Sequence, residues 1–423
     1  MAASLFSRRL TFALFAALLF FVPLARGTVQ PWAQSALMAM VCLLATLLLV
    51  DKTLTGAVIV PKTALSRPFL ALAALVCLSF IFSHSRADGL EAIALFAVYI
   101  VIFYSTQHLA ENRAGQRQVV YLLIAVATVV ALLALIKRFN PYLVPGWWQY
   151  DLDVNNKAMT TGPYGNHNHL AGLLEMIIPL LLGLFLTRER RGTTLWLLIS
   201  LTILLTATHI LALSRGGWFS LAAALVVMFI ILLTQKRFMP KKALLSAVSG
   251  MALVFLLILG GTHIAERLLT LGDETALNFA GRTIAWKGCL SMIAAHPLLG
   301  TGPGSFATLF PAWQPPGIAA RFFQAHNDYL QYAAELGLPV LAIILWVGFI
   351  LTRWLIRLIS HPSRQIWGIS LGAGIGILTI IFHSFVDFNL HIPANAAVFA
   401  TLLGLLSSVA EKKQAKEHNA TVR

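Results

Sequence analysis

A short run of polar side chains interrupts an otherwise apolar sequence at residues 324–337, which read QAHNDYLQYAAELG. His326 stands there beside Asn327 and Asp328, just before a further apolar stretch. An imidazole has an unperturbed pKa of about 6.5, so it can accept a hydroxyl proton near neutral pH. We therefore take His326 as a candidate general base. The alternative is a ring that only caps the following helix or bonds a loop carbonyl.

Asp328 has two interpretations of the same kind. Its carboxylate could orient the imidazole of His326, or it could simply favour the positive end of the following helix. Asn327 and Asp328 are therefore supporting residues in this prediction.

Three arginines are candidates for binding an anion near His326. Arg215 lies in the sequence SRGG, Arg282 in GRTIAWKG, and Arg321 shortly before His326. Guanidinium groups bind phosphate oxygens in bidentate fashion, so two or more of them could hold a diphosphate. For each one, a side chain that only extends from a helix end to the membrane interface is the alternative.

The elements that must position these residues are membrane-spanning helices. Of the 423 residues, 58% are hydrophobic and 11% are charged, whereas roughly a quarter are charged in ordinary soluble domains. Apolar runs near the ~20 residues needed to cross a bilayer recur along the chain. The sequence predicts an all-α polytopic membrane protein with about 12 transmembrane helices, near residues 10–24, 32–50, 68–82, 90–105, 119–136, 170–187, 194–213, 218–234, 242–260, 329–351, 366–386 and 393–409.

Basic residues predict the orientation of these helices. With both termini in the cytoplasm, about two thirds of the 31 Lys and Arg residues fall on inner segments. The net charge of +15 then reflects topology and anionic lipid, so nucleic acid is not an expected partner. We divide the chain into transmembrane helices 1–9 (1–260), a large outer loop (261–328), helices 10–12 (329–409) and a cytoplasmic tail (410–423). The first helix is interpreted as an uncleaved anchor, because Pro23 and the residues after it give no convincing signal-peptide cleavage site.

The large outer loop contains a segment with helical spacing of apolar residues, RTIAWKGCLSMIAAH. It is typical of an amphipathic helix on the membrane surface, with Arg282 and Lys287 toward the headgroups and Trp286 between them. The glycine run GTGPGSF that follows is predicted to be a turn. A phosphate-binding P-loop would need a preceding strand and a final Lys followed by Ser or Thr.

The other long outer segment, 137–169, offers only weak signals. Its aromatic cluster could anchor the protein at the membrane interface or stack on a sugar ring; it consists of Trp147, Trp148 and Tyr150. Two short pairs, Asp151 with Asp153 and His167 with His169, could suggest a metal site, but they fix no coordination geometry. The three cysteines, Cys42, Cys77 and Cys289, form neither a disulfide framework nor a zinc cluster and are interpreted as small apolar residues.

Five motifs, in order, resemble the bacterial O-antigen ligase and O-antigen polymerase superfamily. They are SRGGW at 214–218, GRTIAWKG at 281–288, HPLLGTGPGSF at 296–306, AHNDYLQYAAELG at 325–337 and HSFVDFNLHIPAN at 383–395. The ligase pattern of His, a small amide residue, nine residues and Gly is met by His326, Asn327 and Gly337. The pattern usually ends three positions later in Gly, Thr or Tyr, where this chain has Val340. The choice between ligase and polymerase therefore stays open.

The resemblance implies a fold and an activity. It implies a C-type glycosyltransferase-like membrane protein of the bacterial inner membrane, with its active site on the periplasmic face. The donor would be a glycan on undecaprenyl diphosphate, and the acceptor lipid A core in lipopolysaccharide biosynthesis. Arg215, Arg282 and Arg321 would bind the diphosphate and His326 would be the base, with Asn327, Asp328, Ser214 and Trp286 in support. The transfer would invert the anomeric carbon and need neither metal nor cofactor.

Other functions remain open at this point. A polymerase would use a second carrier-linked glycan as acceptor, and a protein O-oligosaccharyltransferase a Ser or Thr hydroxyl. His383, Asp387 and His391, around the last outer turn, are expected to have a structural or acceptor-side role. A transporter would place ionisable residues at mid-membrane depth, where Glu175 is the clearest candidate.

Overall fold

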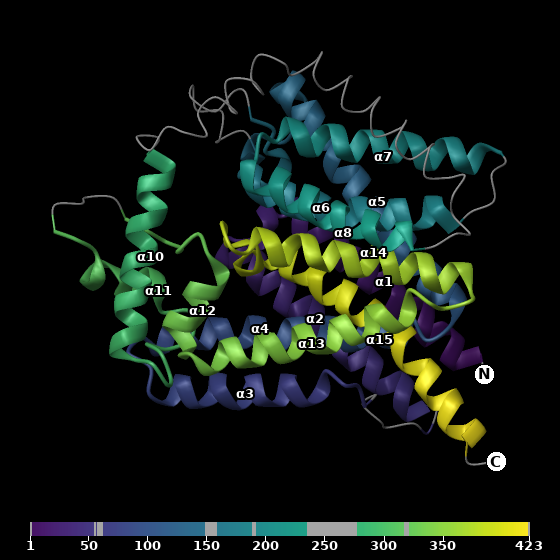
Figure 1. Ribbon diagram of the computed structural model, residues 1–423, viewed down its shortest axis with the longest axis horizontal. Helices are drawn as coiled ribbons and strands as arrows, with labels where there is room; N and C mark the ends of the chain where they lie inside the picture. Colours follow the sequence, from purple (N-terminus) through teal and green to yellow (C-terminus); the bar gives the residue numbers. More distant parts are fainter. Residues whose placement is uncertain are drawn as a thin grey trace.

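In a computed structural model of the chain, every regular element among the described residues is a helix (Figure 1). The structure describes residues 2–54, 56, 62–148, 159–187, 192–234, 277–316 and 321–421. Ten of the helices in these ranges are long and apolar enough to cross a membrane, and α3 is apolar but shorter. The predicted all-α polytopic class is confirmed, while the expected span at 242–260 lies outside the described residues.

The long helices form one bundle. Their bounds are α1 Ala2–Leu24, α2 Pro31–Leu54, α3 Ser66–Ile81, α4 Arg86–Leu109, α5 Arg113–Phe139, α6 His167–Thr187, α7 Thr193–Leu211, α8 Arg215–Leu233, α13 Pro339–Leu358, α14 Arg364–His383 and α15 Pro393–Thr421. Three further α-helices, α10 Leu277–Ala295, α11 Phe306–Leu309 and α12 Asp328–Leu336, belong to the segment that precedes α13. Figure 1 shows α10 across one end of the bundle and both chain termini at the opposite end.

The centre of the bundle is the pair α6 and α14. Glycines at every fourth position of α14, Gly368, Gly372 and Gly376, lie against the α6 backbone, and a Cβ on Gly376 would come within 2.2 Å of the carbonyl oxygen of Met176. Small residues allow this close approach between helices when no lipid or water intervenes. The tight packing fixes the register in which polar side chains of the two helices meet.

A second, smaller core holds α10 against the bundle. It contains Ala285, Cys289 and Met292 of α10 with Phe306 and Phe310 of the following segment. Burial raises the pKa of the Cys289 thiol to about 12, so this cysteine is an unreactive apolar residue, as predicted.

The predicted span at 329–351 is wrong in one respect. The chain instead makes two helices, α12 and α13, separated at Gly337, which has a φ of +79°. A Cβ on Gly337 would come within 2.4 Å of the backbone of Leu298, and the amide of Leu338 donates to the carbonyl of Pro297 at 2.8 Å. The crossing segment of the preceding loop therefore breaks the helix, and the span begins at Pro339.

The glycine run GTGPGSF is a turn, as predicted, and its amides are already occupied. The carboxylate of Glu335 on α12 accepts hydrogen bonds from the amides of Gly304 (2.9 Å) and Phe306 (3.3 Å). Glu335 thus takes the place that a phosphate would occupy in an anion-binding loop. Burial raises the pKa of Glu335, although these hydrogen bonds oppose that shift.

Candidate functional site

His326 lies where α12, α10 and the loop between α14 and α15 meet. Its Nδ1 is 3.4 Å from Oδ1 of Asp387, and its ring packs edge-on against Phe388 with centroids 4.8 Å apart. The side chain of His326 keeps 34% of its surface exposed, whereas Asp387 keeps 1%. One ring nitrogen therefore faces a buried carboxylate while part of the ring remains accessible to a substrate, as a general base requires.

The backbone of His326 is strained. Its φ is +52°, in the left-handed region that side-chain-bearing residues rarely adopt. The next two residues hold it there: the amide of Asp328 donates to the carbonyl of Ser384 at 2.9 Å, and Nδ2 of Asn327 donates to the carbonyl of Phe385 at 2.9 Å. Strain of this kind persists where surrounding contacts determine the conformation, and it is common at active sites.

Asp387 is an ionised carboxylate in this position. Burial alone would raise its pKa, but the hydrogen bond from His326 and the charges of nearby His383 and His169 hold the pKa of Asp387 well below its usual range. Asp387 can therefore stabilise the imidazolium that forms when His326 takes a proton.

The structure gives Asp328 a different partner from the one considered above. Its Oδ1 lies 2.5 Å from Nδ1 of His391, and its Oδ2 accepts from Oγ of Ser384 (2.7 Å) and from the amide of Leu390 (3.2 Å). Asp328 thus binds the loop that carries Asp387 and does not orient His326. Asn327 is the helix cap: its Oδ1 accepts from the amide of Leu330 at 3.0 Å.

Two His–Asp pairs therefore cross between the same two segments. His326 contacts Asp387, and Asp328 contacts His391. These two contacts join residues 325–328 to the loop between α14 and α15. The position and rotation of the His326 ring are fixed in this way.

Arg282 and Arg215 belong to the same site. Burial lowers the pKa of the Arg282 guanidinium, the charge of Asp387 opposes this shift, and the charge of Arg215 adds to it. Arg282 therefore lies within electrostatic reach of both residues. On α10 Arg282 is half-buried while Lys287 is exposed. Arg282 therefore turns toward the site, and only Lys287 keeps the orientation toward the headgroups that we expected for both residues.

The SRGG sequence explains how Arg215 reaches this place. Ser214 caps α8, its Oγ accepting from the amide of Gly217 at 3.2 Å. A Cβ on Gly216 would come within 2.9 Å of Nε2 of His383. Glycine thus lets the first turn of α8 lie against α14, and Arg215 is the first residue of that turn.

Arg321 and Trp286 are less closely tied to the site. Arg321 is exposed, and its guanidinium lies 5.0 Å from the ring centroid of Phe323. Trp286 is half-buried on α10, four residues after Arg282. Their places in donor binding stay predictions.

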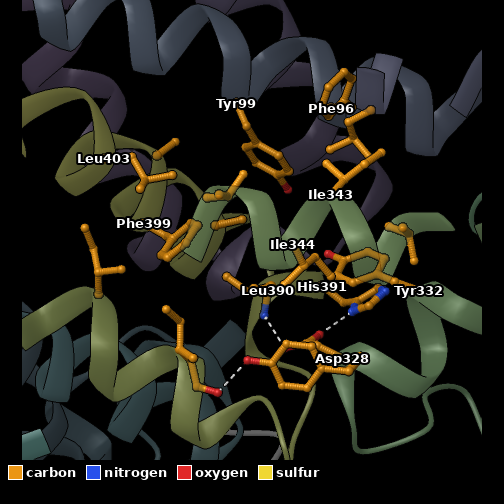
Figure 2. A pocket seen from close by; sticks show the side chains of 18 of the residues that line it. Phe96, Tyr99, Asp328, Tyr332, Ile343, Ile344, Leu390, His391, Phe399 and Leu403 are labelled. Atoms are coloured by element: carbon orange, nitrogen blue, oxygen red, sulfur yellow. Dashed lines mark hydrogen bonds and ion pairs between the residues drawn. The ribbon is translucent and has the colours of Figure 1, made fainter. Parts of the chain in front are cut away.

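A large apolar cavity opens beside the site (Figure 2). Its volume is about 1780 Å³, and its walls come mainly from α4, α12, α13 and α15. Phe388, whose ring packs on His326, also lines it, as do Asp328 and His391. Figure 2 shows these two polar side chains at the cavity together with Tyr332 and Tyr99.

Sequence reasoning missed the role of Asp387 and the partners of Glu175. The resemblance implies a structural or acceptor-side role for Asp387, yet its carboxylate contacts His326 directly. Glu175, considered only as a transporter signal, lies 2.9 Å from Nδ1 of His383. The available signal was the spacing in HSFVDFNLH, where His383 and Asp387 are four residues apart and so share one face of a helical turn.

The weak metal candidates receive no support from the described residues, where no group of three or more His, Cys, Asp or Glu side chains is arranged to hold a metal ion. Asp151 and Asp153 lie outside those residues. His169 is buried, and its ring packs on Phe388 with centroids 4.9 Å apart. Independence from metal stays a prediction.

Comparison with known proteins bears on this site directly. Residues 200–345 match the model of the family described as O-antigen ligase, and the matched stretch contains Arg215, Arg282, Arg321 and His326. No curated protein matches the chain. The family as a whole acts on glycan and lipid-linked substrates. Over residues 200–345 the chain is therefore similar to the O-antigen ligase family.

Proposed function

We propose that this protein transfers a glycan from undecaprenyl diphosphate to an acceptor hydroxyl at the periplasmic face of the bacterial inner membrane. The acceptor is the lipid A core, so the protein is an O-antigen ligase in lipopolysaccharide biosynthesis. The observation that carries the proposal is the contact of the buried Asp387 carboxylate with His326. The charges of Asp387 and Arg215 both act on Arg282, so two cations share the electrostatic surroundings of this base.

The reaction follows from the chemistry of these groups. His326 takes the proton of the acceptor hydroxyl while the oxygen attacks the anomeric carbon. The bond from that carbon to the diphosphate oxygen breaks, and the electron pair leaves with the diphosphate. Arg215 and Arg282 stabilise the charge that grows on the leaving group, the role of preorganised cations. Attack opposite the leaving group inverts the anomeric carbon, and Asp387 stabilises the imidazolium.

The cavity supports a lipid-linked donor. Pockets for drug-sized ligands measure roughly 300–1,000 Å³, so a cavity of about 1780 Å³ with mainly apolar walls is large enough for a long hydrocarbon chain. Through Phe388 it reaches the ring of His326. We assign the isoprenoid chain of the donor to this cavity.

The test is transfer by the purified protein from an undecaprenyl-diphosphate glycan, with EDTA present. Lipid A core and a carrier-linked glycan are offered in separate reactions. Product on lipid A core is expected. Lengthened carrier-linked glycan would instead identify a polymerase, and transfer only to a protein hydroxyl an oligosaccharyltransferase. A protein that does not bind the donor would contradict the whole proposal and favour a transporter.

A further inference from the structure

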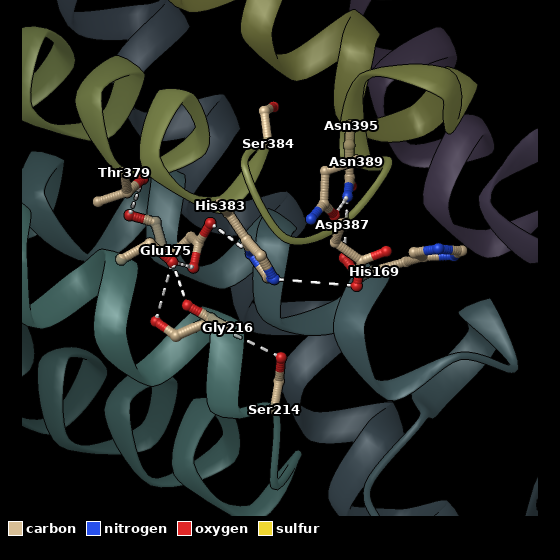
Figure 3. A network of polar contacts seen from close by, with 12 residues as sticks. His169, Glu175, Ser214, Gly216, Thr379, His383, Ser384, Asp387, Asn389 and Asn395 are labelled. Atoms are coloured by element: carbon tan, nitrogen blue, oxygen red, sulfur yellow. Dashed lines mark hydrogen bonds and ion pairs between the residues drawn. The ribbon is translucent and has the colours of Figure 1, made fainter. Parts of the chain in front are cut away.

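A row of alternating imidazoles and carboxylates continues from the site into the core of the bundle. Figure 3 shows its middle part, formed by Asp387, His383 and Glu175. Beyond His326 and Asp387, Nε2 of His383 lies 4.0 Å from Oδ2 of Asp387. Nδ1 of His383 lies 2.9 Å from Oε1 of Glu175, and the other oxygen of Glu175 lies 3.7 Å from Nε2 of His209. The row thus connects a half-exposed histidine to a carboxylate on α6.

The inner part of this row is fully enclosed. Glu175 is 0% exposed, and His383 and His209 are each 1% exposed. A carboxylate in such surroundings is costly unless it is paired and hydrogen-bonded. Ser220 on α8 donates to Glu175 at 3.3 Å, which adds a third partner. An ionisable residue in a membrane-spanning helix that is held in this way is a functional candidate.

His383 holds the key position because each of its ring nitrogens faces a carboxylate. A neutral imidazole can donate a proton from only one nitrogen, whereas the imidazolium can donate from both. Two carboxylates on opposite sides, Glu175 at 2.9 Å and Asp387 at 4.0 Å, therefore favour the cation. Glu175 and His383 are thus in hydrogen-bond contact behind Asp387.

We propose that Glu175 is a positioning residue for glycan transfer: it keeps His383 cationic, and His383 in turn sets how strongly Asp387 holds a proton on His326. This inference rests on the proposed function and deepens it. With the cation in place, part of the charge of Asp387 is balanced, so Asp387 holds a proton on His326 less strongly. Without Glu175 the cation is lost, Asp387 acts on His326 alone, and the base is freed only at higher pH.

Other charged groups face the same carboxylates and must be kept constant. Arg282 from α10 and His169 from α6 act on Asp387, and His209 from α7 acts on Glu175. None of these residues is substituted in the variants below. Arg282 and His169 contribute alike to every profile, whereas loss of Glu175 acts on His209 as well as on His383, and His383→Gln changes the cation without removing the partner of His209.

The experiment measures the initial rate of transfer against pH, at saturating donor and acceptor, for the wild-type protein and Glu175→Gln. Glutamine keeps the shape and can still bond His383 and Ser220. We expect the acid limb of the Glu175→Gln profile to move up by about one pH unit, so that its rate is about tenfold lower at pH 6 and close to wild type above pH 8. Glu175→Asp keeps the charge and is expected to give a smaller shift.

The matched control is Asp51→Asn, which removes another buried carboxylate beside an imidazole. Asp51 lies 3.2 Å from Nε2 of His108, between α2 and α4 and outside the site. Its acid limb is expected to coincide with that of the wild type. If Glu175→Gln does not fold, His383→Gln removes the same cation and is expected to move the limb upward.

Two failures can be told apart. If the wild-type protein transfers no glycan, the proposed function is wrong. If the wild type transfers glycan but the acid limb of Glu175→Gln stays in place, Glu175 has only a structural role, whatever the overall rate. Where Glu175→Gln does not fold, an unmoved acid limb in His383→Gln has the same meaning. A uniform loss of rate at all pH values would also overturn the inference.

Discussion

Asp387 places a buried, ionised carboxylate 3.4 Å from Nδ1 of His326. The two residues come from distant parts of the sequence and are brought together by the crossed contact of Asp328 with His391. A carboxylate on one imidazole nitrogen fixes the tautomer and leaves the other nitrogen to accept a proton. The first prediction follows from this geometry.

Asp387→Asn is expected to slow transfer while leaving donor binding nearly unchanged. An amide keeps the size of the side chain but does not stabilise the imidazolium. General-base catalysis is worth roughly 10²–10⁴-fold, so we expect a loss of at least about tenfold for Asp387→Asn and of 10²-fold or more for His326→Ala. Single-turnover transfer measures the rate, and binding of labelled donor to the detergent-solubilised protein measures affinity. Equal losses of rate and donor affinity would contradict the assignment.

Arg215→Ala and Arg282→Ala are expected to weaken donor binding. Hydrogen bonds to charged groups contribute about 1.5–3 kcal/mol, which corresponds to a rise in donor Kd of roughly 10- to 150-fold for each. Lysine at either position should restore only part of the affinity, because it lacks the planar bidentate donor geometry. Arg321→Ala should have a smaller effect, since Arg321 is exposed.

The control for this series is Lys287→Ala, which removes an exposed cation from the same helix as Arg282. Its donor Kd should equal that of the wild type. A uniform weakening across all four substitutions would mean that the protein attracts the diphosphate by net positive charge alone.

Much of this architecture could be predicted from the sequence, for reasons that are local. Apolar runs of the length of a bilayer predict spanning helices, because the backbone must satisfy its own hydrogen bonds in lipid. His326, Arg215 and Arg282 could be singled out because an ionisable side chain next to an apolar segment has few roles other than a functional one. Each of these inferences needs only one segment of chain.

The partners of these residues could not be predicted, because they depend on contacts between segments. Asp328 is the nearest acid to His326 in the sequence, yet the left-handed backbone of His326 turns the two side chains apart, and Asp387 takes the place beside the ring. The break at Gly337 depends likewise on the loop at Leu298 that crosses it. The nearby Pro339 was the available signal for that break.

The pair of His391 and Asp328 predicts a dependence of stability on pH. Burial alone would lower the pKa of His391, but the hydrogen bond and charge of Asp328 raise it above its usual value. A histidine whose folded pKa is raised contributes stability that is fully present below the unfolded pKa of about 6.5 and is lost as the pH rises through the folded pKa. The unfolding temperature should therefore fall between pH 6 and the higher pH at which His391 loses its proton.

The variant that checks this assignment is His391→Gln. It cannot titrate, so the part of the pH dependence that comes from this pair should disappear, and its unfolding temperature should change by a few degrees less than that of the wild type over the same range. Thermal unfolding in detergent is measured for both proteins by the reaction of a thiol dye with buried Cys289, after the exposed Cys42 and Cys77 have been blocked. Identical pH dependence in the two would show that folding does not change the pKa of His391, which would contradict the assignment.

The cavity predicts that the length of the donor lipid matters. Gly348 of α13 lines it, and a Cβ at this position would have no heavy atom within 4 Å, so a larger side chain enters open space without strain. Gly348→Phe should therefore raise the Kd for the undecaprenyl donor by about tenfold or more, because the ring occupies volume that the lipid would use.

The same variant should bind a donor with only two or three isoprene units as well as the wild type does, since a short chain leaves that part of the cavity empty. The short-chain donor thus serves as the internal control for folding. Equal weakening for both donors would place the effect at the diphosphate end, and no weakening for either would assign the isoprenoid chain to another surface of the bundle.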